Sequence, residues 1–139
     1  MTSTVRDSVA EFFDRFDRAD DAPDSVDAAA LFHPTLLNLD PVSVGMVTRE
    51  QVVASLPLRK QFFAELGISR MRLESLSESP IDDRHTLVRS TWRLETTPDS
   101  ATANGTLFTS TYLLRKAGNT WQIVVYLNHQ DLRALAGRS

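Results

Sequence analysis

The sequence Trp121-Gln-Ile-Val-Val-Tyr-Leu-Asn-His129 is the last long apolar run of the chain, and it follows the turn sequence Lys116-Ala-Gly-Asn-Thr120. The run is rich in β-branched and aromatic residues, which favour strands. Apolar residues occupy both alternating sets of positions, a pattern typical of a strand that is covered on both faces. We therefore predict a central strand here, and we expect the upstream segments to be arranged so that they cover it.

Working back from this strand, apolar residues alternate with polar ones almost without interruption from Ile68 onward. This period of two residues predicts strands over 68–78, 84–95 and 106–116 before the strand over 121–128. The links between these segments are rich in Pro, Gly, Asn and Asp, which form turns. Because consecutive strands with short links pair antiparallel, the second half of the chain is predicted to be an antiparallel meander.

The first half of the chain has a helical period instead. An amphipathic helix is predicted over 5–19, with apolar residues at Val5, Val9, Phe12, Phe13 and Phe16. Its aromatic face suits packing across a sheet. The sequence Asp-Asp-Ala-Pro at 20–23 is expected to end this helix, and a second, short helix is expected from Asp24 to Phe32, because Pro34 disfavours a helical residue before it.

A short strand over 35–40 and a third helix complete the first half. Thr48 and Gln51 have the spacing of a capping box at the start of that helix. Pro57 predicts a break after Leu56, and Gly67 is expected to end the last helical turns in a left-handed conformation. Together these elements predict an α+β fold, with N-terminal helices packed on a curved, mostly antiparallel sheet.

The alternation also separates the two faces of the predicted sheet. On the strand over 84–95, Val88, Ser90, Trp92 and Leu94 share the core face. On the strand over 106–116 both faces are partly apolar, because Leu107 and Leu113 oppose the core-facing residues. A sheet with helices on one side and a half-apolar second face often hides that face in a dimer. We therefore expect a homodimer that forms through the outer face.

Composition places limits on function. The chain has 139 residues, 42% of them hydrophobic and 24% charged, which fits one soluble domain over 1–139. A net charge of −3 provides no basic surface, so neither nucleic acid nor a membrane surface is an expected partner. The absence of cysteine excludes disulfides and thiolate chemistry, and we expect a cytoplasmic location. The three histidines lack ligand spacing, so no metal site and no cofactor are predicted.

The order of elements resembles the NTF2-like superfamily, which includes SnoaL-like and ketosteroid-isomerase-like proteins. The resemblance covers about residues 5 to 135 and rests on four short sequences: Phe12-Phe13-Asp14, Ala29-Ala-Leu-Phe32, Asp40-Pro41 and Arg115-Lys-Ala-Gly-Asn-Thr-Trp-Gln-Ile123. It implies a cone-shaped fold with one pocket. That pocket serves isomerases, cyclases and dehydratases, and also members of the superfamily that only bind a ligand.

The most specific match is to the ketosteroid isomerases, through Leu31-Phe32 followed by Asp40-Pro41-Val42. The resemblance implies that Asp40 is the proton-shuttling base. In those enzymes the oxyanion is held by a Tyr and a protonated Asp. This sequence has Phe16 near the Tyr position and Thr111 or Tyr112 at the Asp position. Because the donors for a developing enolate are missing, steroid isomerisation is not expected.

Two residues are candidates for proton transfer. Asp40 could act as a general base if its surroundings raise its pKa, although Asp-Pro is also ordinary turn chemistry at a strand end. His129 falls on the same alternating positions as Trp121 and Ile123, near the end of the last strand. A neutral imidazole there could move a proton, or it could serve as a structural hydrogen-bonding group.

Six residues are candidates for lining a largely apolar pocket that holds a small organic molecule: Phe16, Asn38, Ser90, Trp92, Ser110 and Tyr112. The alternative interpretation is that the aromatic members belong to the core. Two functions remain open at this point. The protein is either an enzyme that uses Asp40 and His129, or a non-catalytic, dimeric module that binds a ligand or a protein.

Overall fold

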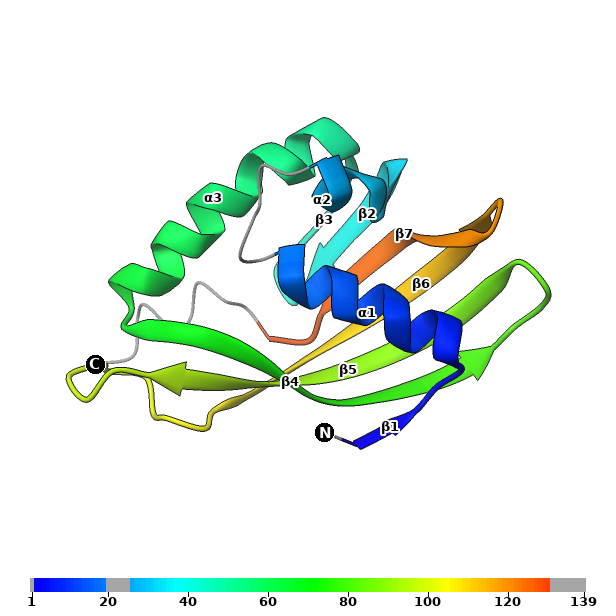
Figure 1. The fold of residues 1–139 in the computed structure, drawn as a ribbon. Coiled ribbons are helices and arrows are strands. Elements are labelled where there is room, and N and C mark those ends of the chain that lie inside the picture. Colours follow the sequence, from blue (N-terminus) through cyan, green and yellow to red (C-terminus); the bar gives the residue numbers. More distant parts are fainter. Residues whose placement is uncertain (1, 20–25, 131–139) are drawn as a thin grey trace.

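The computed structural model describes residues 2–19 and 26–130, and these residues form three helices and seven strands (Figure 1). The helices are α1 (Asp7–Ala19), α2 (Val26–Ala30) and α3 (Arg49–Glu65). The strands are β1 (Thr2–Thr4), β2 (Phe32–Asp40), β3 (Ser43–Thr48), β4 (Ile68–Pro80), β5 (His85–Thr96), β6 (Leu107–Ala117) and β7 (Thr120–Asn128).

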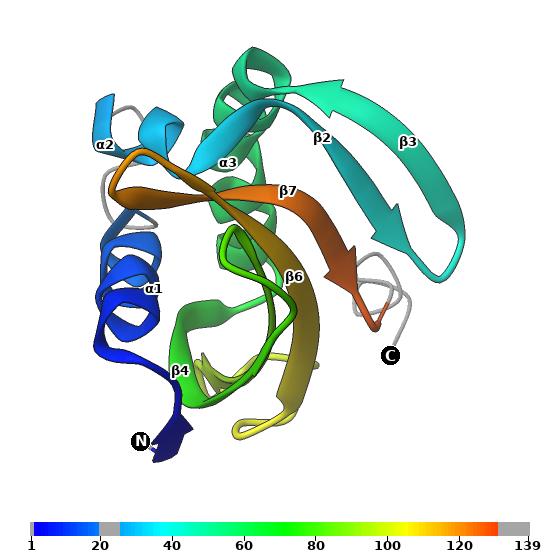
Figure 2. The ribbon, with the colours of Figure 1, turned by 90° about the vertical axis from the view of Figure 1, so that its right-hand side faces the viewer.

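All seven strands form a single sheet in the order β1-β4-β5-β6-β7-β2-β3. Pairing is antiparallel except at two places, where β1 runs parallel to β4 and β2 runs parallel to β7. The sheet curves strongly, and the helices lie on its concave side (Figures 1 and 2). The predicted α+β fold with helices packed on a curved, mostly antiparallel sheet is therefore confirmed.

Strand β7 is an internal strand, as its composition predicted. It pairs antiparallel with β6 on one side and parallel with β2 on the other, so it joins the meander to the N-terminal half of the chain. Its pairing with β6 is interrupted once. Leu113 pairs with Val125 but Leu114 pairs with Ile123, which leaves Val124 as an extra residue, a β-bulge.

The core lies between α1 and the concave face of the sheet. Phe12 and Phe13 on α1 are fully buried, and the ring of Phe13 lies 5.0 Å from that of Tyr112 on β6 in an edge-to-face arrangement. Such aromatic contacts contribute about 0.5–1.5 kcal/mol beyond their buried area. The predicted aromatic face of this helix is thus the face that packs on the sheet.

Helix α3 differs from the prediction at Pro57 and agrees with it at both ends. The capping box is present: Thr48 Oγ1 accepts from Gln51 N at 3.1 Å, and Gln51 Oε1 accepts from Thr48 N at 2.8 Å. Gly67 follows the helix with φ of 78°. The predicted break after Leu56 is wrong, because the helix continues through Pro57 and forgoes only the hydrogen bond that a proline nitrogen cannot donate.

Two strands and one strand boundary differ from the sequence prediction. The sequence pattern does not indicate strands β1 and β3, and β2 begins at Phe32, a residue predicted to end the second helix. β3 forms a hairpin with β2, in which Leu37 pairs with Met46. Its apolar residues Val44 and Met46 are exposed, which explains why its pattern did not indicate a strand with a buried face. The predicted helix break at 20–23 and the predicted start at Asp24 lie outside the described residues.

Among helices in the part of the chain that the structure describes, none combines the length and the apolar character needed to cross a membrane.

Candidate functional site

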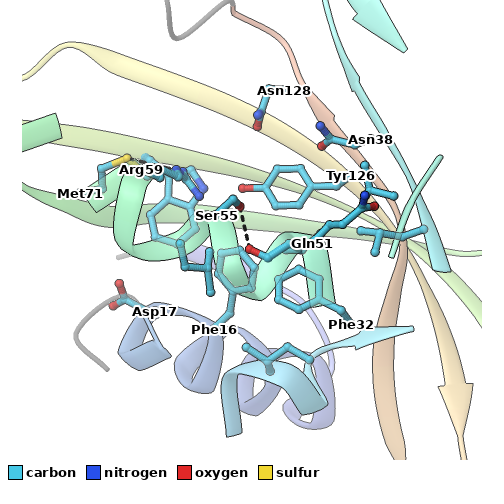
Figure 3. Close-up of a pocket in the computed structure, with 16 residues that line it drawn as sticks. Phe16, Asp17, Phe32, Asn38, Gln51, Ser55, Arg59, Met71, Tyr126 and Asn128 are labelled. Atoms are coloured by element: carbon cyan, nitrogen blue, oxygen red, sulfur yellow. Dashed lines mark hydrogen bonds between the residues drawn. The ribbon is translucent and has the colours of Figure 1, made fainter. Parts of the chain in front are cut away.

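A cavity of about 320 Å³ lies between the helices and the concave face of the sheet (Figure 3). Its volume is at the small end of the range of roughly 300–1,000 Å³ that is usual for small-molecule sites. Most of the wall is apolar, contributed by Phe16, Leu31, Phe32, Leu36, Val47, Val52, Leu56, Met71 and Trp92. The remaining wall residues are polar or carry a polar end, and they are Asp17, Asn38, Gln51, Ser55, Arg59, Tyr126 and Asn128.

Three of these polar residues come from the paired strands β2 and β7. Asn38 and Tyr126 are direct partners in the parallel ladder, and Asn128 lies two residues beyond Tyr126 on the same face. The hydroxyl end of Tyr126 points into the cavity (Figure 3). This hydroxyl makes no hydrogen bond with any residue that the structure describes, although the residue as a whole is only 8% exposed.

Helix α3 contributes a polar stripe at a spacing of four residues, formed by Gln51, Ser55 and Arg59. Gln51 and Ser55 are exposed, so this is where the cavity meets solvent. The Ser55 hydroxyl donates to the Val52 carbonyl oxygen at 2.6 Å. The Arg59 guanidinium lies over the ring of Phe63, 5.2 Å from its centroid, which leaves a cationic group beside the cavity.

Helix α1 contributes an aromatic ring and a carboxylate. Phe16 is at the centre of an aromatic cluster, with its ring 6.0 Å from that of Trp92 and 6.2 Å from that of Tyr126. Asp17, the next residue, is the one carboxylate among the wall residues. The cavity therefore has an aromatic floor and a polar rim of mixed character.

Three of the six predicted pocket residues line this cavity, namely Phe16, Asn38 and Trp92, and three lie behind its wall. Ser90, Ser110 and Tyr112 are completely buried. The Trp92 indole donates to Ser90 Oγ at 2.8 Å, and Ser90 Oγ donates to the Tyr112 hydroxyl at 3.0 Å. Burial raises the pKa of Tyr112 above its ordinary value, so this phenol stays neutral.

Asp40 does not line the cavity, because its carboxylate is turned toward the β2–β3 hairpin. Asp40 Oδ1 accepts hydrogen bonds from the backbone nitrogens of Val42 and Ser43, both at 2.9 Å. This is the geometry of a turn carboxylate, the alternative that the Asp-Pro sequence left open. The residue that the ketosteroid isomerase resemblance assigns as a base is therefore used here by the local backbone.

His129 lies on the convex face of the sheet, away from the cavity. The expectation that it shares a face with Trp121 and Ile123 is wrong, because the extra residue at Val124 reverses the alternation. Beyond the bulge, Tyr126 and Asn128 face the cavity and Val125 faces outward. The structure thus does not bring Asp40 and His129 together at a common site.

Sequence reasoning missed most of the polar wall. The stripe on α3 did carry a signal, since Gln51, Ser55 and Arg59 recur every four residues beside the apolar Val52 and Leu56. Tyr126 and Asn128 carried none, because a bulge within Val124-Val125 does not alter the composition of the strand.

Among the residues described by the structure, no group of three or more His, Asp or Glu side chains is arranged to hold a metal ion.

Comparison with known proteins places the fold within a recognised class. No protein-family model matches the sequence, and no curated protein is similar to it in sequence. Solved structures do match, and several of them are described as NTF2-like or as having a cystatin-like fold. The fold of this chain is therefore the NTF2-like fold, as the order of its elements indicated, and no subfamily is assigned.

Three of these solved structures show how similar the matches are in fold and in sequence. A provisionally assigned ketosteroid isomerase from Shewanella frigidimarina has a TM-score of 0.71 at 11% identity, over 92% of this chain and 99% of that chain. An NTF2-like protein with a cystatin-like fold from Novosphingobium aromaticivorans has a TM-score of 0.71 at 13% identity, over 94% and 87%. A provisionally assigned dehydratase of the NTF2-like family from Streptomyces avermitilis has a TM-score of 0.61 at 16% identity, over 90% and 95%.

Proposed function

We propose that this protein binds a small, largely apolar organic molecule in the cavity between α1, α3 and the concave face of the sheet. The observation that carries the proposal is the composition of the cavity wall. Nine apolar residues surround a space of about 320 Å³ that is edged by a few polar groups, the usual make-up of a small-molecule site. The volume suits a compound of one or two fused rings.

The experiment is a binding titration by calorimetry with naphthalene derivatives, supported by thermal shift, since a ligand of the native state raises the unfolding midpoint. Ser55→Trp places an indole at the cavity mouth and is expected to abolish binding. Ala54→Trp is the matched control, because Ala54 is exposed on the same helix and does not line the cavity. Equal binding by both variants, or no binding by the wild-type protein, would refute the proposal.

Catalysis in the same cavity is a second candidate, favoured by the carboxylate of Asp17 in the wall. Isomerase, cyclase and dehydratase chemistry each needs a base that moves a proton next to a carbonyl. The test is exchange of the α-hydrogens of bound 2-acetonaphthone for deuterium, followed by NMR. Asp17→Asn is expected to abolish exchange, while Asp14→Asn, an exposed change on the same helix, is expected to leave it intact. A wild-type protein that binds without exchange is a binding module.

We also propose that two copies associate through the convex face of the sheet. Register places Met46, Leu37, Val125, Leu113 and Leu87 in one row across five neighbouring strands. Met46 is 66% exposed and Leu87 is 40% exposed, although both carry large apolar side chains. A continuous apolar row of this kind is typical of a surface covered by a second copy.

A further inference from the structure

The polar groups of the cavity wall are not an even mixture of donors and acceptors. We infer that the ligand carries a hydrogen-bond acceptor, a carboxylate or a conjugated carbonyl, at one end of its apolar body. This inference rests on the proposed function and specifies which molecules the cavity selects.

The first donor is the amide of Gln51. Its oxygen, Oε1, accepts from the backbone nitrogen of Thr48 at 2.8 Å in the capping box of α3. A backbone N–H can only donate, so the atom facing it must be the amide oxygen. The orientation of this amide is thereby fixed. Its nitrogen is the group left to face the cavity that Gln51 lines.

The second donor is the amide of Asn128, which is oriented from behind the wall. Its Oδ1 accepts from the buried hydroxyl of Ser110 at 2.8 Å. Ser110 is completely buried, so this partner is held firmly in place. With the oxygen engaged in this way, the amide nitrogen of Asn128 is the group available on the cavity side.

The third donor is the phenol of Tyr126, whose hydroxyl points into the cavity without a hydrogen-bond partner among the described residues (Figure 3). The guanidinium of Arg59, which can only donate, lines the same space. Against these groups stand Asp17 and the unconstrained amide of Asn38. Because donors predominate and the amide of Gln51 is fixed in orientation by the Thr48 N–H, an acceptor on the ligand is favoured over a donor.

Donors that a bound ligand covers also impose a cost if the ligand leaves them unpaired. A bound molecule without a polar group strips water from these N–H and O–H groups and returns no hydrogen bond. A protonated amine cannot accept from any of these donors, and it must also give up its own hydration on binding. The preference is therefore expected to follow the order carboxylate or ketone, then hydrocarbon, then amine.

The test uses four naphthalenes of similar size: 2-naphthoate, 2-acetonaphthone, 2-ethylnaphthalene and 2-(aminomethyl)naphthalene. Dissociation constants are measured by calorimetry for the wild-type protein, Gln51→Glu and Asn128→Asp. Each substitution keeps the oxygen that accepts from Thr48 or Ser110 and replaces the cavity-facing N–H₂ with an anionic oxygen. In both variants we expect the affinity for 2-naphthoate to fall by about tenfold or more and the affinity for the amine to rise. The affinity for 2-ethylnaphthalene should change little.

Asn104→Asp is the matched control. Asn104 Oδ1 likewise accepts from a backbone nitrogen, that of Thr96 at 3.0 Å, and lies in an exposed loop outside the cavity wall. It adds the same negative charge, so an equal loss of 2-naphthoate binding in this variant would attribute the effect to net charge and overturn the inference.

The two proposals fail in different ways. If all four compounds bind the wild-type protein equally well, the cavity is a binding site but the donor preference is refuted. If the hydrocarbon or the amine binds best, the preference has the opposite sign and is likewise refuted. If none of them binds, the proposed function fails and this inference fails with it.

Discussion

Thr111 and His129 are joined on the convex face of the sheet by a hydrogen bond of 2.7 Å between Thr111 Oγ1 and His129 Nε2. Burial lowers the pKa of His129 from its ordinary value of 6.5, and the positive charge of Arg89 lowers it further. The imidazole is therefore neutral at pH 7. Its hydrogen bond with Thr111 lies on the side of the sheet opposite the cavity.

The first prediction concerns this imidazole and pH. Because the folded pKa is depressed, the unfolded chain binds the proton first as pH falls below about 6.5. Stability that is present above that value is then lost until the folded form is also protonated. We expect urea unfolding at pH 7.5, 6.5 and 5.5 to show this loss in the wild-type protein and a smaller loss in His129→Gln. If the free energy of unfolding falls equally with pH in the two proteins, this prediction is wrong.

A second prediction concerns Glu78, whose side chain is only 2% exposed. It accepts from the backbone nitrogen of Arg6 at 3.0 Å and from the Thr86 hydroxyl at 2.6 Å. Burial alone would raise the pKa of Glu78, but the hydrogen bonds from Arg6 and Thr86 outweigh it and lower that pKa. Glu78→Gln weakens these charge-assisted bonds and is expected to lower the free energy of unfolding by about 1–3 kcal/mol.

The control for that change is Glu74→Gln, which breaks a more exposed pair. Glu74 and Arg93 are 38% and 43% exposed, so solvent screens their attraction and little change in stability is expected. Chemical unfolding of both variants at pH 7 provides the comparison, and an equal effect of the two substitutions would show that burial does not set the difference.

A third prediction separates the two interpretations of Asp40. If its carboxylate serves the turn, Asp40→Ala removes two hydrogen bonds from the β2–β3 hairpin and costs about 1 kcal/mol. Asp40→Asn retains the Oδ1 acceptor and is expected to cost less. Neither variant should change ligand affinity, because the residue does not line the cavity. Loss of binding or of proton exchange in Asp40→Asn, with stability unchanged, would restore the assignment of Asp40 as a base.

A fourth prediction concerns Tyr126 and its buried neighbour Tyr112. Tyr126→Phe removes only the hydroxyl that points into the cavity, so affinity for 2-naphthoate should fall about tenfold while affinity for 2-ethylnaphthalene is retained. Tyr112→Phe removes a hydroxyl that accepts from Ser90, and it should lower stability without this shift in ligand preference. The opposite pattern would place the functional phenol on β6.

The fifth prediction concerns the apolar row on the convex face. Leu113→Lys puts a charge between Val125 and Leu87 in that row and is expected to yield a monomer by light scattering at micromolar concentrations. Leu58→Lys is the matched control on α3, where the leucine is 67% exposed, and it should leave the dimer intact. A wild-type protein that is monomeric under these conditions would refute the association.

Much of the fold could be predicted from sequence because its signals are local. The aromatic period of α1 and the alternation along β4 to β7 show which face each element buries, and the capping box at Thr48 and Gln51 marks the start of α3. The break predicted at Pro57 was wrong because proline lowers only the intrinsic helix propensity, whereas tertiary packing decides whether the helix continues. β3 was missed because it is an edge strand on which Val44 and Met46 are exposed.

The site was harder to predict because it depends on contacts between distant segments. The concave face of the sheet carries Ser90, Ser110 and Tyr112, as a cavity there would require. However, the ring of Phe13 lies 5.0 Å from that of Tyr112 and covers this part of the concave face. No property of these residues alone shows that a helix covers them. Open space remains farther along, beside β2 and α3, and only the three-dimensional arrangement identifies it.

The extra residue at Val124 divides β7 into two parts of opposite parity. If β7 kept Val124 but ran without the bulge, regular alternation would exchange the chemistry of the two faces of the sheet: Tyr126 and Asn128 would turn to the convex side, and Val125, Leu127 and His129 would turn inward. The cavity would then hold an imidazole where it now holds a phenol and an amide. In a chain of this fold, one β-bulge can thus decide which side chains enter a binding site.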